Sequence, residues 1–205
     1  MKNKSLLTIV ILLIAMSIEA QETGTYTDSR KDKKTYKTVK IGTQTWMAEN
    51  LAFKTKKGCW AYNNNQDRVA TYGFLYDWET AKNVCPSGWH LPSDAEWTIL
   101  TNYLGGESIA GGKMKESGTT NWESPNADAN NKSSFTGLPG GYRDNGGLES
   151  GEGTFEDIGI GGNFWSSTEQ SASKAWYRYL GNDFGRVGRD YGNKLNGQSV
   201  RCIKD

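Results

Sequence analysis

The sequence predicts an α+β fold in which two helices pack on a twisted, mostly antiparallel sheet beside a long glycine-rich loop region. Ser93 to Leu104 has the periodicity and the capping residues of a helix. Residues from Phe164 onward alternate as strands do. The 25 glycines among 205 residues, with an aromatic content of 12%, indicate many tight turns between short strands.

The first twenty residues have the pattern of a secretory signal peptide. Lys2 and Lys4 precede an apolar run from Leu6 to Met16, and Ala20-Gln21 is a candidate cleavage point. This run is too short to span a bilayer, and no cysteine follows it to carry a lipid. We therefore expect a secreted protein, periplasmic or on the cell surface, with no membrane insertion after cleavage.

About 185 residues follow this segment, enough for one domain with a core. Residues 21–35 are polar, and we expect them to form a flexible leader before a single domain over residues 36–205. Cleavage would take the formal net charge from +1 to zero, because it removes two lysines and one glutamate. A neutral chain with interspersed charges has no electrostatic footprint for nucleic acid or anionic lipid.

The domain is predicted to open with a short hairpin over residues 36–46. Tyr72 to Val84 is predicted as the first helix, because its apolar residues fall near helical spacing. The second helix begins at Ser93, which forms a capping box with Glu96, and ends at Gly105-Gly106.

Residues 105–163 contain few regular signals, but their spaced aromatics favour an ordered, glycine-jointed loop region. Strands are predicted at 164–168, 175–180 and 198–203. In the middle one, Trp176 and Arg178 share one face, and Tyr177 and Tyr179 share the other.

Three cysteines, Cys59, Cys85 and Cys202, occur in a chain that we expect to be exported. An oxidising compartment then favours one disulfide and one leftover thiol. The residues by themselves leave three pairings open.

A series of segments resembles a known family. They follow in order to the end of the chain: Thr38–Leu51, Tyr72–Ala81, Cys85–Trp97, Leu138–Arg143, Phe164–Glu169, Ala175–Leu180 and Ser199–Asp205. In them the chain resembles the Fibrobacter succinogenes major paralogous domain, a family of secreted or surface proteins of unsettled function. The resemblance implies a C-type-lectin-like fold, similar to the terminal domain of bacterial collagen-like adhesins and to formylglycine-generating enzymes. It also implies that the segments of Cys85 and Cys202 lie side by side, and hence that these two cysteines form the disulfide.

Signals for catalysis are weak. His90 is the single histidine, which excludes a mechanism with two imidazoles, and a packing or capping role suits it better. The formylglycine-generating relatives use cysteines in their active site, but no matching local pair is found here. We therefore predict no catalytic residue and no cofactor.

Signals for a metal are weak as well. Residues 126–130 have the alternating Asn and Asp of a calcium loop, but Asn131 and Gly137 stand where that loop needs glycine and glutamate. No metal ligand is therefore predicted. Four acidic residues leave open an irregular calcium site or a pair of glycosidase carboxylates: Asp144, Glu149, Glu152 and Asp157.

The loops combine planar aromatic side chains with polar ones, as ligand-binding surfaces do. The candidate ligand-binding residues are Trp122, Tyr142, Arg143, Asp144, Phe184, Arg186, Arg189 and Tyr191. The alternative is that the aromatic residues fill the core of a loop-rich domain.

We expect a secreted, non-catalytic binding or adhesion module that recognises a glycan or a surface protein through its loop face. One alternative is an enzyme, either carbohydrate-active or a degenerate form of the formylglycine-generating type. The other is a structural cell-surface component.

Overall fold

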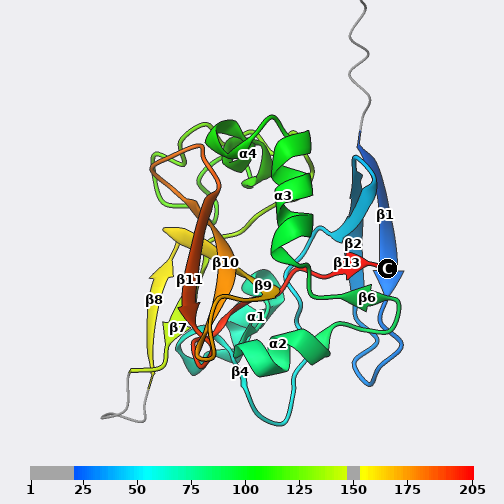
Figure 1. Ribbon diagram of the computed structural model, residues 1–205, viewed down its shortest axis with the longest axis vertical. Helices are drawn as coiled ribbons and strands as arrows, with labels where there is room; N and C mark the ends of the chain where they lie inside the picture. Colours follow the sequence, from blue (N-terminus) through cyan, green and yellow to red (C-terminus); the bar gives the residue numbers. More distant parts are fainter. Residues whose placement is uncertain (1–20, 147–152) are drawn as a thin grey trace, which may run out of the picture.

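The computed structural model describes residues 21–146 and 153–205 (Figure 1). The predicted signal peptide, residues 1–20, lies outside the described residues. Two sheets and four α-helices make up the described part of the chain, so the fold is α+β as predicted. In Figure 1 the two sheets stand on opposite sides of helix α3.

The first sheet joins both ends of the domain. Its strands follow the order β1 (Glu22–Thr27), β2 (Thr35–Ile41), β3 (Gln44–Met47), β13 (Ile203–Lys204) and β6 (Trp89–His90). All neighbours are antiparallel, and Ile203 pairs with Trp46 on one side and with His90 on the other. The predicted hairpin over residues 36–46 is confirmed as β2 and β3.

A strand occupies part of the segment that was predicted as a flexible leader. β1 pairs with β2 from Glu22 opposite Lys40 to Thr27 opposite Thr35. Its polar side chains are mostly exposed, which suits an edge strand whose pairing depends on backbone hydrogen bonds rather than on an apolar face. The prediction was therefore wrong for these residues.

The second sheet is larger. It runs in the order β11 (Gly188–Asn193), β10 (Lys174–Gly181), β9 (Gly161–Glu169), β12 (Gln198–Ser199), β5 (Leu75–Tyr76) and β4 (Cys59–Trp60). β7 (Gly140–Asp144) pairs in parallel with β9 and antiparallel with β8 (Thr154–Ile158). The strands predicted at 164–168 and 175–180 are confirmed as parts of β9 and β10, whereas the one predicted at 198–203 is divided into β12 and β13.

The helix predicted over residues 72–84 is not continuous. The end of α1 (Val69–Tyr72), strand β5 and helix α2 (Trp78–Val84) occupy this segment. Two 3-10 turns, Tyr62–Asn64 and Gln66–Arg68, lead into α1. Gly73 has a φ of 72° and ends α1, so that β5 intervenes before α2. α2 begins after Asp77, whose side chain accepts a hydrogen bond from the backbone N–H of Thr80.

The second predicted helix is confirmed as α3 (Asp94–Tyr103), with both hydrogen bonds of the Ser93–Glu96 capping box present. A further helix, α4 (Glu107–Met114), lies in the region predicted as loop. The sequence did not predict α4, because Gly111 and Gly112 have low helix propensity. Their lack of side chains is required by packing, because a Cβ at Gly111 would lie 2.2 Å from the Arg186 carbonyl oxygen and one at Gly112 would lie 2.5 Å from that of Asp128.

Aromatic residues from both sheets meet on α3. Trp97 of α3 packs against Trp46 of β3 and Phe164 of β9, with ring centroids 4.8 and 5.9 Å apart. Phe135 completes this cluster. The fully buried Arg201 closes it on one side and donates hydrogen bonds to the Asn50 side chain and to the Thr136 carbonyl.

Cys85 and Cys202 form a disulfide, as the family resemblance implied. Cys59 is the free cysteine of the described chain. None of the described helices is long and apolar enough to cross a membrane.

Candidate functional site

A polar cavity of about 480 Å³ opens on the part of the second sheet formed by β7 to β11. Four tyrosines line it: Tyr142, Tyr177, Tyr179 and Tyr191. The polar lining consists of Asp144, Asp157, Asp190, Asn163, Asn196 and Gln198. Among the described residues, no lysine, arginine or histidine contributes to this lining. We call this site the tyrosine cavity.

The register of β9, β10 and β11 places one wall of the tyrosine cavity. Tyr177 and Tyr179 lie two residues apart on β10, so they share a face. Tyr179 pairs with Asn163 of β9, and Tyr177 pairs with Asp190 of β11. Residues directly opposite each other in a sheet point to the same face, so these four side chains gather on one side.

The hairpin of β7 and β8 supplies the other wall. The Tyr142 hydroxyl donates a hydrogen bond of 2.7 Å to Glu156, which is its cross-strand partner. Asp144 lies two residues further along the same face of β7. Asp157 follows Glu156 with a φ of 63°, a left-handed conformation that interrupts the alternation of β8.

Negative charges converge in the tyrosine cavity. Burial raises the pKa of Tyr177 to about 12, and the carboxylates of Asp190 and Asp157 add to this rise. Burial, the hydrogen bond to Glu156 and the charges of Glu156, Asp157 and Asp144 raise the pKa of Tyr142. The pKa of Asp157 itself is raised by burial and by the charge of Glu156. Asp157 therefore lies within electrostatic reach of both tyrosine hydroxyls.

Gln198 contributes an unsatisfied amide to the lining. Its side chain is almost fully buried, and its Oε1 atom is one of three buried side-chain N or O atoms in the described residues without a hydrogen-bond partner. The amide nitrogen lies beside Gly192, another lining residue, where an added Cβ would come within 3.3 Å of it. An unpaired buried amide oxygen costs free energy, and a bound donor would relieve it only if the amide turned its oxygen toward the cavity.

Five of the eight residues predicted to bind a ligand lie in or beside the tyrosine cavity. Tyr142, Asp144 and Tyr191 line it, although the Tyr191 ring packs on Trp176. Phe184 and Arg186 lie at its edge on Tyr179. The Phe184 ring contacts the Tyr179 ring, and Arg186 donates a hydrogen bond of 3.2 Å to the Tyr179 hydroxyl.

The other three, Trp122, Arg143 and Arg189, lie away from the cavity. Trp122 is 1% exposed and donates its indole N–H to the Gly137 carbonyl, so it is a core residue and the prediction that it binds a ligand is not supported. Arg143 alternates with Tyr142 on β7 and therefore points to the other face of the strand. Its guanidinium lies 4.3 Å from the centre of the Trp60 ring.

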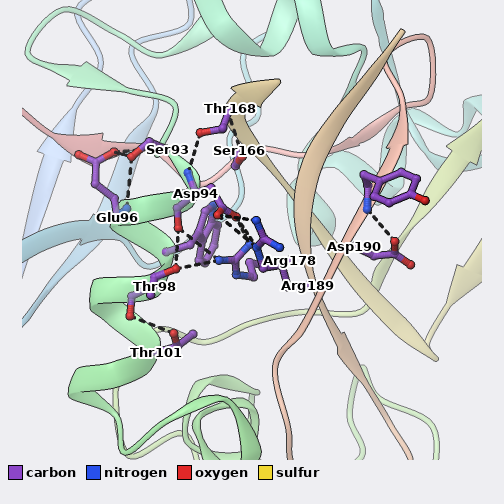
Figure 2. A network of polar contacts seen from close by, with 12 residues as sticks. Ser93, Asp94, Glu96, Thr98, Thr101, Ser166, Thr168, Arg178, Arg189 and Asp190 are labelled. Carbon is purple, nitrogen blue, oxygen red and sulfur yellow. Dashed lines mark hydrogen bonds and ion pairs between the residues drawn. The ribbon is translucent and has the colours of Figure 1, made fainter. Parts of the chain in front are cut away.

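Arg189 lies on the opposite face of β11, in the polar network of Figure 2. Its guanidinium stacks 3.5 Å from the centre of the Trp176 ring and pairs with Asp94 at the start of α3. The buried Arg178 donates to the same carboxylate. Figure 2 shows Asp190 on the far side of the strands from this network. Alternation along β11 thus separates Arg189 from the cavity.

The sequence analysis missed most of the tyrosine cavity. Tyr177 and Tyr179 were predicted to share one face of a strand, but no neighbouring residue in the sequence indicates that this face lines a cavity. Asn163, Asp190 and Gln198 come from three strands, and only their pairing brings them together. Gln198 carried no signal in the sequence.

The acidic residues suggested for a calcium site or a hydrolase are divided. Asp144 and Asp157 line the cavity, whereas Glu149 and Glu152 lie outside the described residues. Within residues 21–146 and 153–205, no group of three or more His, Cys, Asp or Glu side chains is arranged to hold a metal ion.

Comparison with known families agrees with the resemblance. The family model of the Fibrobacter succinogenes major domain matches residues 39–204. The chain therefore belongs to this family. No curated protein and no solved structure matches the chain.

Proposed function

We propose that the chain is a non-catalytic binding module and that its ligand enters the tyrosine cavity. The observation that carries this proposal is the composition of the cavity wall, where the rings of Tyr142, Tyr177 and Tyr179 stand beside three carboxylates and an unsatisfied amide. Rigid aromatic rings with a few oriented polar groups are the usual lining of ligand sites. The cavity volume of about 480 Å³ lies within the range of such sites.

We also propose that the protein acts outside the cytoplasm, secreted, periplasmic or on the cell surface. The disulfide between Cys85 and Cys202 supports this, because stable disulfides form in oxidising compartments. The signal-peptide pattern of residues 1–20 supports it independently.

The finer fold assignment is a proposal too. A C-type-lectin-like arrangement is supported by the first sheet, in which β13 from the end of the chain lies between β3 and β6. It is also supported by the long irregular region between α4 and β7, which separates strands β1 to β6 from strands β7 to β13 along the sequence.

A glycoside hydrolase is the second candidate, because the carboxylates of Asp144, Asp157 and Asp190 share one cavity. A general acid needs a raised pKa, and that of Asp157 is raised by burial and Glu156. The formylglycine-generating type has less support, since it needs a cysteine pair. Cys85 and Cys202 are bound to each other, and Cys59 is the remaining thiol.

The test uses the mature protein, residues 21–205, on arrays of glycans and of surface-protein peptides, with aryl glycosides assayed for turnover. Tyr142→Ala and Asp190→Ala each remove one lining side chain, on opposite walls of the cavity. Ile99→Ala, an exposed residue of α3 outside the lining, is the matched control. Binding that is lost in the first two variants, at unchanged melting temperature, supports the proposal. Binding that survives both variants overturns the cavity as the site, and turnover that requires Asp157 favours the hydrolase.

A further inference from the structure

The chemistry of the tyrosine cavity is asymmetric. Three carboxylates enter its wall, and no cationic side chain of the described residues compensates them there. Arg186 reaches the Tyr179 hydroxyl at the edge, but it is exposed and lies outside the lining. A cavity with this charge repels anions and attracts cations.

The aromatic residues suit the same kind of ligand. The face of a tyrosine ring attracts a cation that lies within about 6 Å of its centre. Tyr177 and Tyr179 stand side by side on β10, with ring centroids 6.2 Å apart, and Tyr142 stands on the opposite wall. The Arg186 guanidinium already lies 5.8 Å from the centre of the Tyr179 ring, so the rings of Tyr177 and Tyr142 are the ones without a cation among the described residues. Aromatic rings around a cation are one arrangement that holds ammonium groups in proteins.

The hydrogen-bonding groups point to a ligand that donates. The Tyr142 hydroxyl is already committed as a donor to Glu156, and the Tyr179 hydroxyl accepts from Arg186. Turning the Gln198 amide about its last side-chain bond would present its unpaired oxygen to the cavity. Ammonium has three N–H donors and guanidinium has five, and neither group has an acceptor, so both match the three carboxylates of the lining, which only accept. A sugar hydroxyl also donates, but it does not compensate the three carboxylates.

We infer that the tyrosine cavity binds the cationic end of a lysine or arginine side chain presented by a protein partner. The inference rests on the proposed function and gives the class of its ligand. The cavity is larger than one such side chain needs, so residues next to the lysine or arginine would also enter it. The carboxylates supply the charge, the tyrosine rings cover the alkyl stem and the cation, and Gln198 accepts one N–H.

The test is a titration of the ¹⁵N-labelled mature protein with small probes, followed by NMR. The cationic probes are the N-acetyl methylamides of lysine and arginine. The matched uncharged probe is the same derivative of norleucine, and methyl glucoside and methyl galactoside represent neutral sugars. We expect the cationic probes to shift the backbone signals of Asp144, Tyr179, Asp190 and Gln198, and norleucine to leave them unchanged. Raising the salt concentration should weaken this binding.

Variants then test which carboxylates attract the cationic probes. Asp157→Asn and Asp190→Asn should each weaken binding of the cationic probes at least fivefold. Asp32→Asn, an exposed carboxylate in the loop between β1 and β2, should not change it. If the sugars shift these signals and the cationic probes do not, the inference is wrong while the proposed function stands. If no probe shifts them, both the inference and the cavity as a binding site are overturned.

Discussion

Cys85 and Cys202 are joined by a disulfide across 117 residues of sequence, with their Cα atoms 5.9 Å apart. Cys85 follows the last residue of α2, and Cys202 precedes β13. The bond therefore connects the α2 region to the end of the chain, inside the core cluster that contains Trp78 and Trp165.

Replacing both cysteines by serine should lower the free energy of unfolding by about 4–5 kcal/mol, because the bond closes a loop of more than a hundred residues in the unfolded chain. For a domain of this size that corresponds to a fall in melting temperature of about 10 °C or more. Differential scanning calorimetry measures it. Cys59→Ser is the control and should change the melting temperature much less. Non-reducing peptide mapping that joins Cys59 to either partner would contradict the assignment.

Lys115 should be a stability determinant despite its charge. Its fully buried ammonium donates to the carbonyl oxygens of Ala127, Gly181 and Phe184, each at 2.8 Å. Lys115→Met leaves these buried acceptors unpaired, and we expect a loss of about 3 kcal/mol or more in urea unfolding. Lys113→Met removes a single hydrogen bond, to the Leu104 carbonyl, and should cost clearly less. Equal losses in the two variants would show that the three-carbonyl site adds nothing.

Breaking the pair of Asp94 and Arg178 should be costly. Arg178 is 1% exposed, and its guanidinium depends on Asp94 for its carboxylate partner. Asp94→Ala leaves a buried cation unpaired, with an expected loss of about 3 kcal/mol or more in the free energy of unfolding. Arg189→Ala breaks only the more exposed pair with Asp94 and should change stability by about 1 kcal/mol or less. Chemical denaturation measures both losses in the free energy of unfolding. A loss in Arg189→Ala as large as that in Asp94→Ala would contradict the prediction.

His90 should make stability depend on pH. Its Nδ1 lies 2.6 Å from Asp205 and its Nε2 lies 2.9 Å from Glu96. Burial alone would lower the pKa of His90, but the hydrogen bonds and charges of Asp205 and Glu96 outweigh burial and raise it above 6.5. Since the folded state holds the proton more tightly, the stabilisation is complete below pH 6.5 and is lost as pH rises through the folded-state pKa.

His90→Gln cannot take up this proton. The stability difference between the wild type and this variant should therefore be largest near about pH 6 and should shrink toward about pH 9. Thermal melts across this range measure the difference. A difference that stays constant over the whole range would mean that His90 acts by packing and not by its charge.

Local chemistry accounts for the elements that were predicted correctly. The capping box of Ser93 and Glu96 is complete within four residues, so the start of α3 could be predicted to within one residue. The alternation of β10 is equally local. α4 was hidden because Gly111 and Gly112 lower helix propensity, and the reason for them, close contact with the backbone of Arg186 and Asp128, lies elsewhere in the chain.

For this protein, the sequence by itself determined the α+β class, the family and the strand pattern of the aromatic residues, because these depend on local spacing and on ordered motifs. Only the tertiary structure decided which aromatic residues are available to a ligand. Trp122 and Tyr142 both lie in the region predicted as loop, yet one fills the core and the other lines a cavity. The physical reason is strand pairing. The register of β7 to β12 sets the face of each strand's side chains, and it gathers tyrosines, carboxylates and Gln198 from distant segments at one cavity.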